Sequence, residues 1–151
     1  MDTRQHHFIR RIIDIGKDMT LATIRPDGFP QATTVSYASD DLILYVGIGS
    51  RSQKASNIRH CNKVSLTINA SYVDWDDIQG ISMSAYASIL DDPDAVRHAT
   101  ERMVRRYPQV AKWSDGDPSA STDILLLEIR PMVVSMLDYR QGFGHTELVT
   151  L

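Results

Sequence analysis

The sequence is organised around one polar stretch, Gly49-Ser50-Arg51-Ser52-Gln53-Lys54-Ala55-Ser56-Asn57-Ile58. An apolar, β-branched run from Leu42 to Val46 precedes it, and such a run is typical of a strand. Within the stretch, Ala55 and Ile58 are spaced so that both lie on one face of a helix. The stretch therefore predicts the end of a strand, a polar turn and the start of a helix, and the neighbouring elements can be read outward from it.

The polar turn in this stretch has the composition of an anion-binding site. Ser50 or Ser52 can cap the helix, because a serine oxygen accepts a hydrogen bond from a free amide of the first turn. Arg51 and Lys54 add two cations beside the positive end of the helix, where a phosphate is favoured. The alternative is an ordinary capped surface helix with solvated cations, which is the more common case among short basic turns. The residues alone leave both interpretations open.

The bulk composition indicates one ordinary globular domain. The 151 residues predict a single domain, residues 1–151, with 42% hydrophobic and 23% charged residues. A net charge of −3, from 16 basic and 19 acidic residues, provides no basic field for nucleic acid. The single cysteine, Cys61, excludes an intrachain disulfide, and no apolar run approaches the roughly 20 residues that span a bilayer. Because residues 1–5 lead into no signal-like apolar core, we expect a cytoplasmic protein with no membrane and no nucleic-acid partner.

Hydrophobic periodicity predicts an α+β fold. Apolar residues at helical spacing predict an amphipathic helix from Thr3 to Asp14 that stops at Gly16. The expected strands are Met19–Arg25, Ala32–Ala38, Leu42–Val46, Val64–Ile68, Gly80–Leu90, Ile124–Ile129, Val133–Leu137 and Leu148–Leu151, with further helices at Ser52–His60 and from Pro93 to Pro108, and loops at Ala70–Asp77 and Ser114–Ser121. Tight turns and the lack of a βαβ rhythm indicate a small barrel of six to seven mostly antiparallel strands with flanking helices.

The chain lacks the common catalytic and metal-binding motifs. No GxSxG sequence supports a nucleophilic serine, and no CxxC or HExxH spacing supports a zinc site, so we expect no metal. The helix that follows Pro93 carries several basic residues, which are predicted to form a solvated face: Arg97, Arg102, Arg105 and Arg106.

The tail near the C-terminus carries a second candidate binding feature. Gly142 and Gly144 flank Phe143, directly ahead of His145. Glycines let the backbone approach a large flat molecule closely, so His145 is a candidate ligand contact. The alternative is a turn with an exposed histidine.

The order of elements from Met19 to Leu90 resembles one known family. A Pro-Asp-Gly hairpin is followed by a strand rich in Thr, Val and Tyr, then by a strand containing Tyr45, then by the pattern Ser-x-Lys-Ala-x-x-Ile and by Lys63-Val64-Ser65-Leu66. This ordered set is similar to the pyridoxamine 5′-phosphate oxidase-like family of FMN-binding split barrels. The rest of the chain matches more loosely.

The resemblance implies a homodimer of split barrels with FMN at the subunit interface. By this resemblance the strand from Thr33 to Ala38 runs along the flavin, largely through backbone contacts, and Lys54 takes the place of a phosphate-binding lysine. The residues that the resemblance assigns to the cofactor are Thr33, Thr34, Val35, Ser36, Tyr37, Tyr45, Val46, Ser52, Gln53, Lys54 and Gln79, with Arg51 close enough to assist and His145 as a further contact.

Departures from the family pattern limit the expected activity. True oxidases of the family carry an arginine where Thr33 stands, a lysine where Ala38 stands, and a cation where Gln53 stands. Their substrate-phosphate motif and their C-terminal ending are also absent. We therefore expect no oxidation of pyridoxamine phosphate, but an FMN-binding flavoprotein that acts as an oxidoreductase on an unidentified small molecule.

Three alternatives stay open at the level of sequence. A deazaflavin presents a phosphate and a tricyclic ring, as FMN does. The Gly142-Phe143-Gly144 ending is similar to those of haem-utilisation split barrels, so a haem-binding protein with His145 as a contact is the main alternative function. A ligand-free structural dimer is the third.

Overall fold

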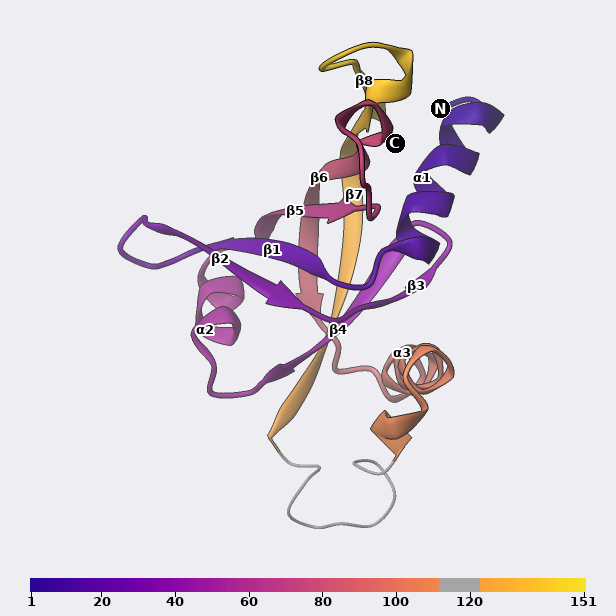
Figure 1. Ribbon diagram of the computed structural model, residues 1–151. Coiled ribbons are helices and arrows are strands. Elements are labelled where there is room, and N and C mark those ends of the chain that lie inside the picture. The colour runs from indigo at the N-terminus through magenta and orange to yellow at the C-terminus, as the bar shows by residue number, and fades with distance from the viewer. Residues whose placement is uncertain (112–122) are drawn as a thin grey trace.

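The computed structural model describes residues 1–111 and 123–151 (Figure 1). The loop expected at Ser114–Ser121 lies outside these residues. The strands are β1 (Met19–Ile24), β2 (Pro30–Val35), β3 (Ala38–Asp40), β4 (Ile43–Gly49), β5 (Lys63–Asn69), β6 (Gln79–Ile89), β7 (Ile124–Asp138) and β8 (Thr146–Thr150). The helices are α1 (Thr3–Ile15), α2 (Gln53–His60) and α3 (Pro93–Arg106), with short 3₁₀ turns η1 (Trp75–Asp77), η2 (Pro108–Val110) and η3 (Tyr139–Gln141). No helix in the described ranges is long and apolar enough to cross a membrane.

All the strands belong to one antiparallel sheet, in the order β2-β1-β5-β6-β7-β4-β3, with β8 paired to β7. After Val35 the chain leaves β1, and from Ala38 it pairs with β4 at the opposite end of the sheet. The sheet therefore curls into a barrel that stays open between its two edge strands, β2 and β3 (Figure 1). This arrangement confirms the predicted α+β split barrel.

Two strand boundaries differ from those that the sequence predicts. The expected strand Ala32–Ala38 is two strands, β2 and β3, because the chain changes pairing partner between them. The expected pair Ile124–Ile129 and Val133–Leu137 is the single long strand β7. Pro131, at which the sequence predicts a break, lies where the register with β6 shifts between Ser84 and Ala85. A bulge leaves a residue outside the regular ladder, so a proline is tolerated there.

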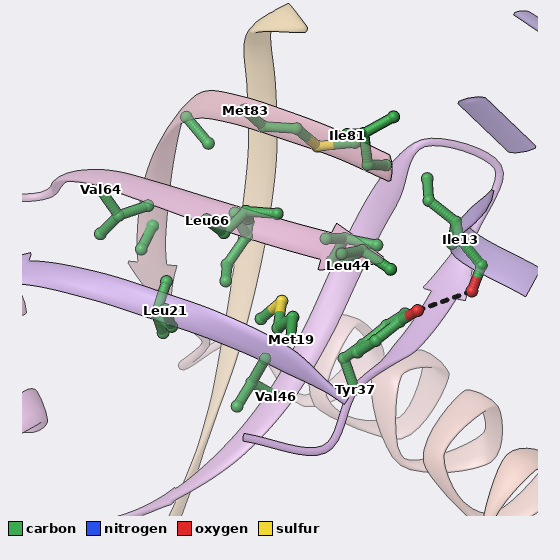
Figure 2. Close-up of a cluster of buried hydrophobic side chains, with 14 of the residues drawn as sticks. Ile13, Met19, Leu21, Tyr37, Leu44, Val46, Val64, Leu66, Ile81 and Met83 are labelled. Carbon is green, nitrogen blue, oxygen red and sulfur yellow. Dashed lines mark hydrogen bonds between the residues drawn. The ribbon is translucent and has the colours of Figure 1, made fainter. Parts of the chain in front are cut away.

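Alternation along the strands builds the core. Ile81, Met83, Ala85 and Ala87 of β6 are buried, whereas the serines and the tyrosine between them are exposed. Figure 2 shows side chains from several strands meeting in the barrel, among them Leu21, Leu44 and Leu66. The period-two pattern read from β6 is thereby confirmed.

Tyr37 joins the helix α1 to the barrel. Its side chain is fully buried, and its hydroxyl donates to the carbonyl oxygens of Ile13 at 2.7 Å (Figure 2) and of Gly16 at 3.2 Å. Burial raises the pKa of Tyr37 to about 12, so the hydroxyl stays protonated and donates. Because these carbonyls belong to the C-terminal end of α1, the bonds satisfy acceptors that the helix leaves free.

The prediction of a fully solvated arginine face on α3 is wrong for two of its members. The guanidinium carbon of Arg106 lies 4.5 Å from the centre of the Tyr37 ring, and Arg106 also donates to the carbonyl of Gly16. Arg102 donates to Asp40 at 2.6 Å. Arg97 and Arg105 are exposed, as predicted. The two exceptions arise because α3 packs against β3 and the end of α1, a contact that helix periodicity does not reveal.

Gly16→Ala is expected to lower the free energy of unfolding by about 1–3 kcal/mol, because overpacking a filled core displaces its neighbours. A Cβ atom at position 16 would lie 2.7 Å from the Tyr37 hydroxyl oxygen and would also overlap the side chain of Ile68. Denaturant unfolding measures the change. Gly47→Ala is the matched control, since the nearest atom to its added Cβ lies at 3.5 Å, and an equal loss in both variants would contradict the packing explanation.

Candidate anion-binding site

The turn before α2 brings three of the predicted cofactor residues together. Ser52 is the N-cap of α2, and its hydroxyl oxygen accepts from the backbone N–H of Ala55 at 3.2 Å. Lys54, in the first turn of the helix, is half-buried and reaches across to β2, where its Nζ donates to the Thr33 hydroxyl at 2.9 Å. The structure therefore gathers a cation, a hydroxyl from the strand and the N-terminal end of a helix in one place.

A buried polar network sets the position of α2, and the sequence analysis missed it. Asn57 is fully buried; its Nδ2 donates to Thr23 at 3.0 Å and to Gln31 at 3.1 Å. Its Oδ1 accepts from Gln53 at 2.8 Å. Buried polar groups require partners, so these bonds fix the helix against β1 and β2. The available signal was the position of Asn57, which is adjacent to the apolar Ile58 and two residues after Ala55.

The same network engages the side chain of Gln53. Its side-chain amide donates to Asn57, so the contact that the family resemblance assigns to Gln53 stays a prediction, for which the backbone amide of that residue is available. The first amides of a helix have no acceptor within the helix and are suited to an anion.

Arg51 is highly exposed, at 86%, and pairs with Asp123 at 3.1 Å. An exposed ion pair of this kind contributes little to stability, so Arg51 is available to turn toward an anion. Its proposed assistance to Lys54 stays a prediction.

The strand β2 presents its residues on two faces and one open edge. Thr33 and Val35 are half-buried and share a face, while Thr34 and Ser36 are exposed on the other. Among the described strands only β1 pairs with β2, so the second edge of its backbone is free. A free backbone edge fits the expected backbone contacts along this segment. The side chain of Tyr37 lies in the core, so only its backbone could contribute.

Tyr45 and Val46 also point their side chains into the protein. Val46 belongs to the main core. Tyr45 is 4% exposed and packs under α3, where its ring meets the ring of His98 edge-on with centroids 5.8 Å apart. Burial raises the pKa of Tyr45. For both residues the predicted cofactor contact is restricted to the backbone.

Gln79 and His145 lie elsewhere in the same protomer. Gln79 is buried at the start of β6, accepts from Arg11 at 2.7 Å and donates to Asp138 at 2.7 Å. His145 lies next to Asp138, whose backbone N–H donates to the His145 carbonyl at 3.0 Å. In Figure 1 this end of β6 and β7 is at the top, well away from α2 at the lower left. One protomer therefore does not bring Gln79 or His145 to Lys54.

Asp138 is the acceptor at the centre of this second cluster. Burial alone would raise the pKa of Asp138, but hydrogen bonds from Gln141 and Gln79 outweigh it and lower that pKa. The carboxylate therefore stays charged and holds the start of β6 against the end of β7.

Two cavities lie away from Lys54. The first, of about 230 Å³, is lined by Thr20, Thr34 and Thr67 among others, and thus opens on the outer face of β2. The second, of about 370 Å³, lies between the end of α1 and Arg106. Within residues 1–111 and 123–151, no cluster of side chains has the composition of a metal site.

A family model matches most of the chain. The model for pyridoxamine 5′-phosphate oxidase aligns with residues 8–138. The chain belongs to the pyridoxamine 5′-phosphate oxidase family. The family that the order of elements indicated is thereby confirmed for this member. None of the curated proteins compared with the chain matches it.

Solved structures share the fold of this family member. A heme binding protein from Mycobacterium smegmatis aligns with 99% of the chain at a TM-score of 0.81 and 16% identity, and the chain spans 59% of that protein. HutZ, the heme storage protein from Vibrio cholerae, aligns over 94% of the chain and 91% of its own length, at a TM-score of 0.70 and 16% identity. A conserved hypothetical protein from Mycobacterium tuberculosis is 25% identical over 97% of the chain and 91% of its own length, with a TM-score of 0.76.

Asn57→Leu is expected to lower the free energy of unfolding by about 1–3 kcal/mol, because it leaves Thr23, Gln31 and Gln53 without their shared partner. Denaturant unfolding measures the loss. Ser56→Leu places the same side chain on the exposed face of the same helix and is expected to stay within about 0.5 kcal/mol of the unmodified protein. A similar loss in both variants would show that α2 does not depend on this network.

Proposed function

We propose that this protein is an FMN-binding flavoprotein and that it works as an oxidoreductase on a small molecule. The observation that carries the proposal is the contact between Lys54 and Thr33 at the N-terminal end of α2. An ammonium group, a threonine hydroxyl and the first amides of a helix are donors that suit a phosphate. The free edge of β2, the strand that carries Thr33, suits the extended remainder of a flavin nucleotide.

Residues of this chain would bind and orient the cofactor. Lys54 would hold the phosphate together with the backbone amides of the turn, and β2 would lie along the flavin. The flavin itself supplies hydride or electron transfer when bound. The protein would position the flavin, exclude water from part of its surface and control the surroundings of its ring.

The surroundings of Ala38 support an activity other than oxidation of pyridoxamine phosphate. Ala38 is fully buried and packs with Tyr45, Ala99 and Met103 beneath α3. The lysine that true oxidases carry at this position would have to bury its charge there, which is unfavourable without a partner.

We further propose a cytoplasmic homodimer with the cofactor at the subunit interface. The free edge of β2 and the separation of Gln79 from Lys54 within one protomer support a second copy. A reduced cytoplasmic setting is consistent with the single cysteine, Cys61. The net charge of −3 gives no support to a nucleic-acid partner.

Lys54→Ala is expected to weaken FMN binding roughly tenfold or more, because a hydrogen bond from a charged group contributes about 1.5–3 kcal/mol. Quenching of flavin fluorescence during titration gives the dissociation constant. Arg105→Ala, which removes an exposed cation on α3, is the matched control and is expected to bind as the unmodified protein does.

An ultraviolet–visible spectrum of the purified protein provides the simplest check, since bound flavin makes it yellow. Colourless protein that does not bind added FMN would contradict the proposal. If such protein instead bound a deazaflavin, the proposed binding site would be retained with a different cofactor. If it bound neither, a ligand-free dimer would become the better description.

The second candidate function is haem binding. The observation that favours it is the tail, where Gly142 and Gly144 adopt positive φ angles of 128° and 73° on either side of an exposed Phe143 and His145 follows. Such a turn offers an open aromatic surface and an imidazole, the commonest haem ligand type. Two proteins of similar fold are named for haem.

If haem binds at the tail, a haem titration is expected to produce a shifted Soret band that His145→Ala abolishes. His7→Ala removes an exposed histidine on α1 and should leave the shift unchanged. A titration with no Soret shift, or a shift that persists in His145→Ala, would contradict haem ligation by His145.

A further inference from the structure

Two adjacent carboxylates lie in the turn between β3 and β4. Asp40 is the last residue of β3, and Asp41 follows it with a positive φ of 53°. We name these two residues the acidic turn. Aspartate adopts this left-handed conformation more readily than most residues, so the turn can present two carboxylates side by side.

Asp40 binds a histidine and an arginine that are four residues apart on α3. Its Oδ2 lies 2.9 Å from Nε2 of His98, and its Oδ1 accepts from Nη2 of Arg102 at 2.6 Å. Residues four apart lie on one face of a helix, so both side chains reach the same carboxylate. We name His98, Asp40 and Arg102 the α3 clamp. The side chain of His98 is 43% exposed, so it can exchange protons with solvent.

Asp41 repeats this arrangement with α1. Nε2 of His6 lies 2.8 Å from its Oδ1, and Arg10 donates to the same oxygen at 3.1 Å. Burial alone would raise the pKa of Asp41, but hydrogen bonds from Arg10 and His6 outweigh it and lower that pKa. The acidic turn therefore binds α1 and α3, which lie above and below β3 in Figure 1.

The two helices depend on the acidic turn to different extents. The helix α1 buries three isoleucines in the main core: Ile9, Ile12 and Ile13. The helix α3 buries two side chains, Ala99 and Met103, and these pack with Ala38 and Tyr45 in a smaller, separate cluster. Less apolar burial holds α3, so the α3 clamp provides a larger share of its attachment.

The C-terminal end of α3 has an attachment of its own. Arg106 donates to the carbonyl oxygens of Ile13 and Gly16, and its guanidinium lies over the ring of Tyr37. These contacts hold the last turn of the helix. The preceding turns, which carry His98 and cover the small cluster, are the part that the α3 clamp controls.

His98 is the group of the α3 clamp that changes charge near neutral pH. An imidazole ordinarily takes up a proton at about pH 6.5, whereas aspartate and arginine keep their charges from about pH 5.5 to about pH 8. The ring of Tyr45 meets the His98 ring edge-on at 5.8 Å, and burial raises the pKa of Tyr45, so this hydroxyl stays neutral. Beyond Tyr45, Glu128 and Arg130 of β7 are paired with each other at 2.6 Å.

The other charged groups near His98 also keep their charges over this range. On α3, Asp94 lies four residues before His98 and is paired with Arg97 at 2.8 Å, and the exposed Glu101 lies three residues after it. On the acidic turn, Asp41 is bound to α1. A change in the attachment of α3 near neutral pH can therefore be traced to the proton on His98.

We propose that the α3 clamp is a pH-sensitive device that holds α3 over β3 and β4 more firmly in acid. A neutral His98 can give Asp40 a hydrogen bond, whereas a protonated His98 gives it an ion pair, which is the stronger contact. The added stability is present while the imidazole is charged and is lost as the pH rises and the proton leaves. Because α3 covers Tyr45, the device would couple acidity to how firmly β4 is held.

Hydrogen exchange of the α3 amides tests the proposal on the full chain without any cofactor. Protection factors are used, because they correct for the intrinsic dependence of exchange on pH. In the unmodified protein, protection of residues 97–103 is expected to be about two- to fivefold higher at about pH 5.5 than at about pH 8, which is the contribution of a partly exposed ion pair.

Two substitutions of His98 separate charge from structure. His98→Gln keeps a neutral donor for Asp40 and is expected to give the lower protection at both pH values. His98→Lys carries a permanent charge and is expected to give the higher protection at both. His60→Gln is the matched control, since it replaces an exposed histidine on α2 and should leave the pH dependence of α3 unchanged.

Two results would overturn the proposal. One is protection of α3 in the unmodified protein that does not change between the two pH values. The other is a pH dependence that persists in His98→Gln. Neither measurement involves flavin, so both outcomes are independent of the proposed function.

Discussion

The buried hydroxyl of Tyr37 is the interaction on which the rest of the structure depends. It lies between β2 and β3, where the chain passes from one end of the sheet to the other. By donating to the carbonyls of Ile13 and Gly16 it fixes the end of α1, and Arg106 covers its ring from α3. One side chain thus joins two helices to the point where the barrel opens. On either side of that point, β2 and β3 form the two edges of the sheet.

The candidate site follows from this open edge. The helix α2 lies against β1 and β2, and its buried Asn57 has hydrogen-bonding partners only if the helix takes that position. Lys54, one turn earlier, then reaches Thr33. The cationic turn and the hydroxyl face of β6 are both left uncovered by a single protomer. The proposed homodimer would cover them, which links the proposed cofactor site to the second copy.

Local sequence patterns were sufficient to predict much of the fold. The alternation of β6, the Ser52 cap and the amphipathic face of α1 depend on residues close in sequence, and the structure confirms all three. The unbroken course of β7 could not be predicted in the same way. Whether Pro131 ends a strand depends on the register of the neighbouring β6, which shifts opposite it. No property of the sequence around Pro131 contains that information.

The sequence by itself determined the alternation of buried and exposed positions, the cationic composition of the turn before α2 and the family, because each of these depends on residue types in a fixed local order. Only the tertiary structure decided which polar groups meet. It joined Asn57 to Thr23, bonded the side chain of Gln53 to Asn57 and placed Arg106 on Tyr37. The physical reason is that long polar side chains select partners by distance in space, and a curled sheet brings together residues that are dozens of positions apart.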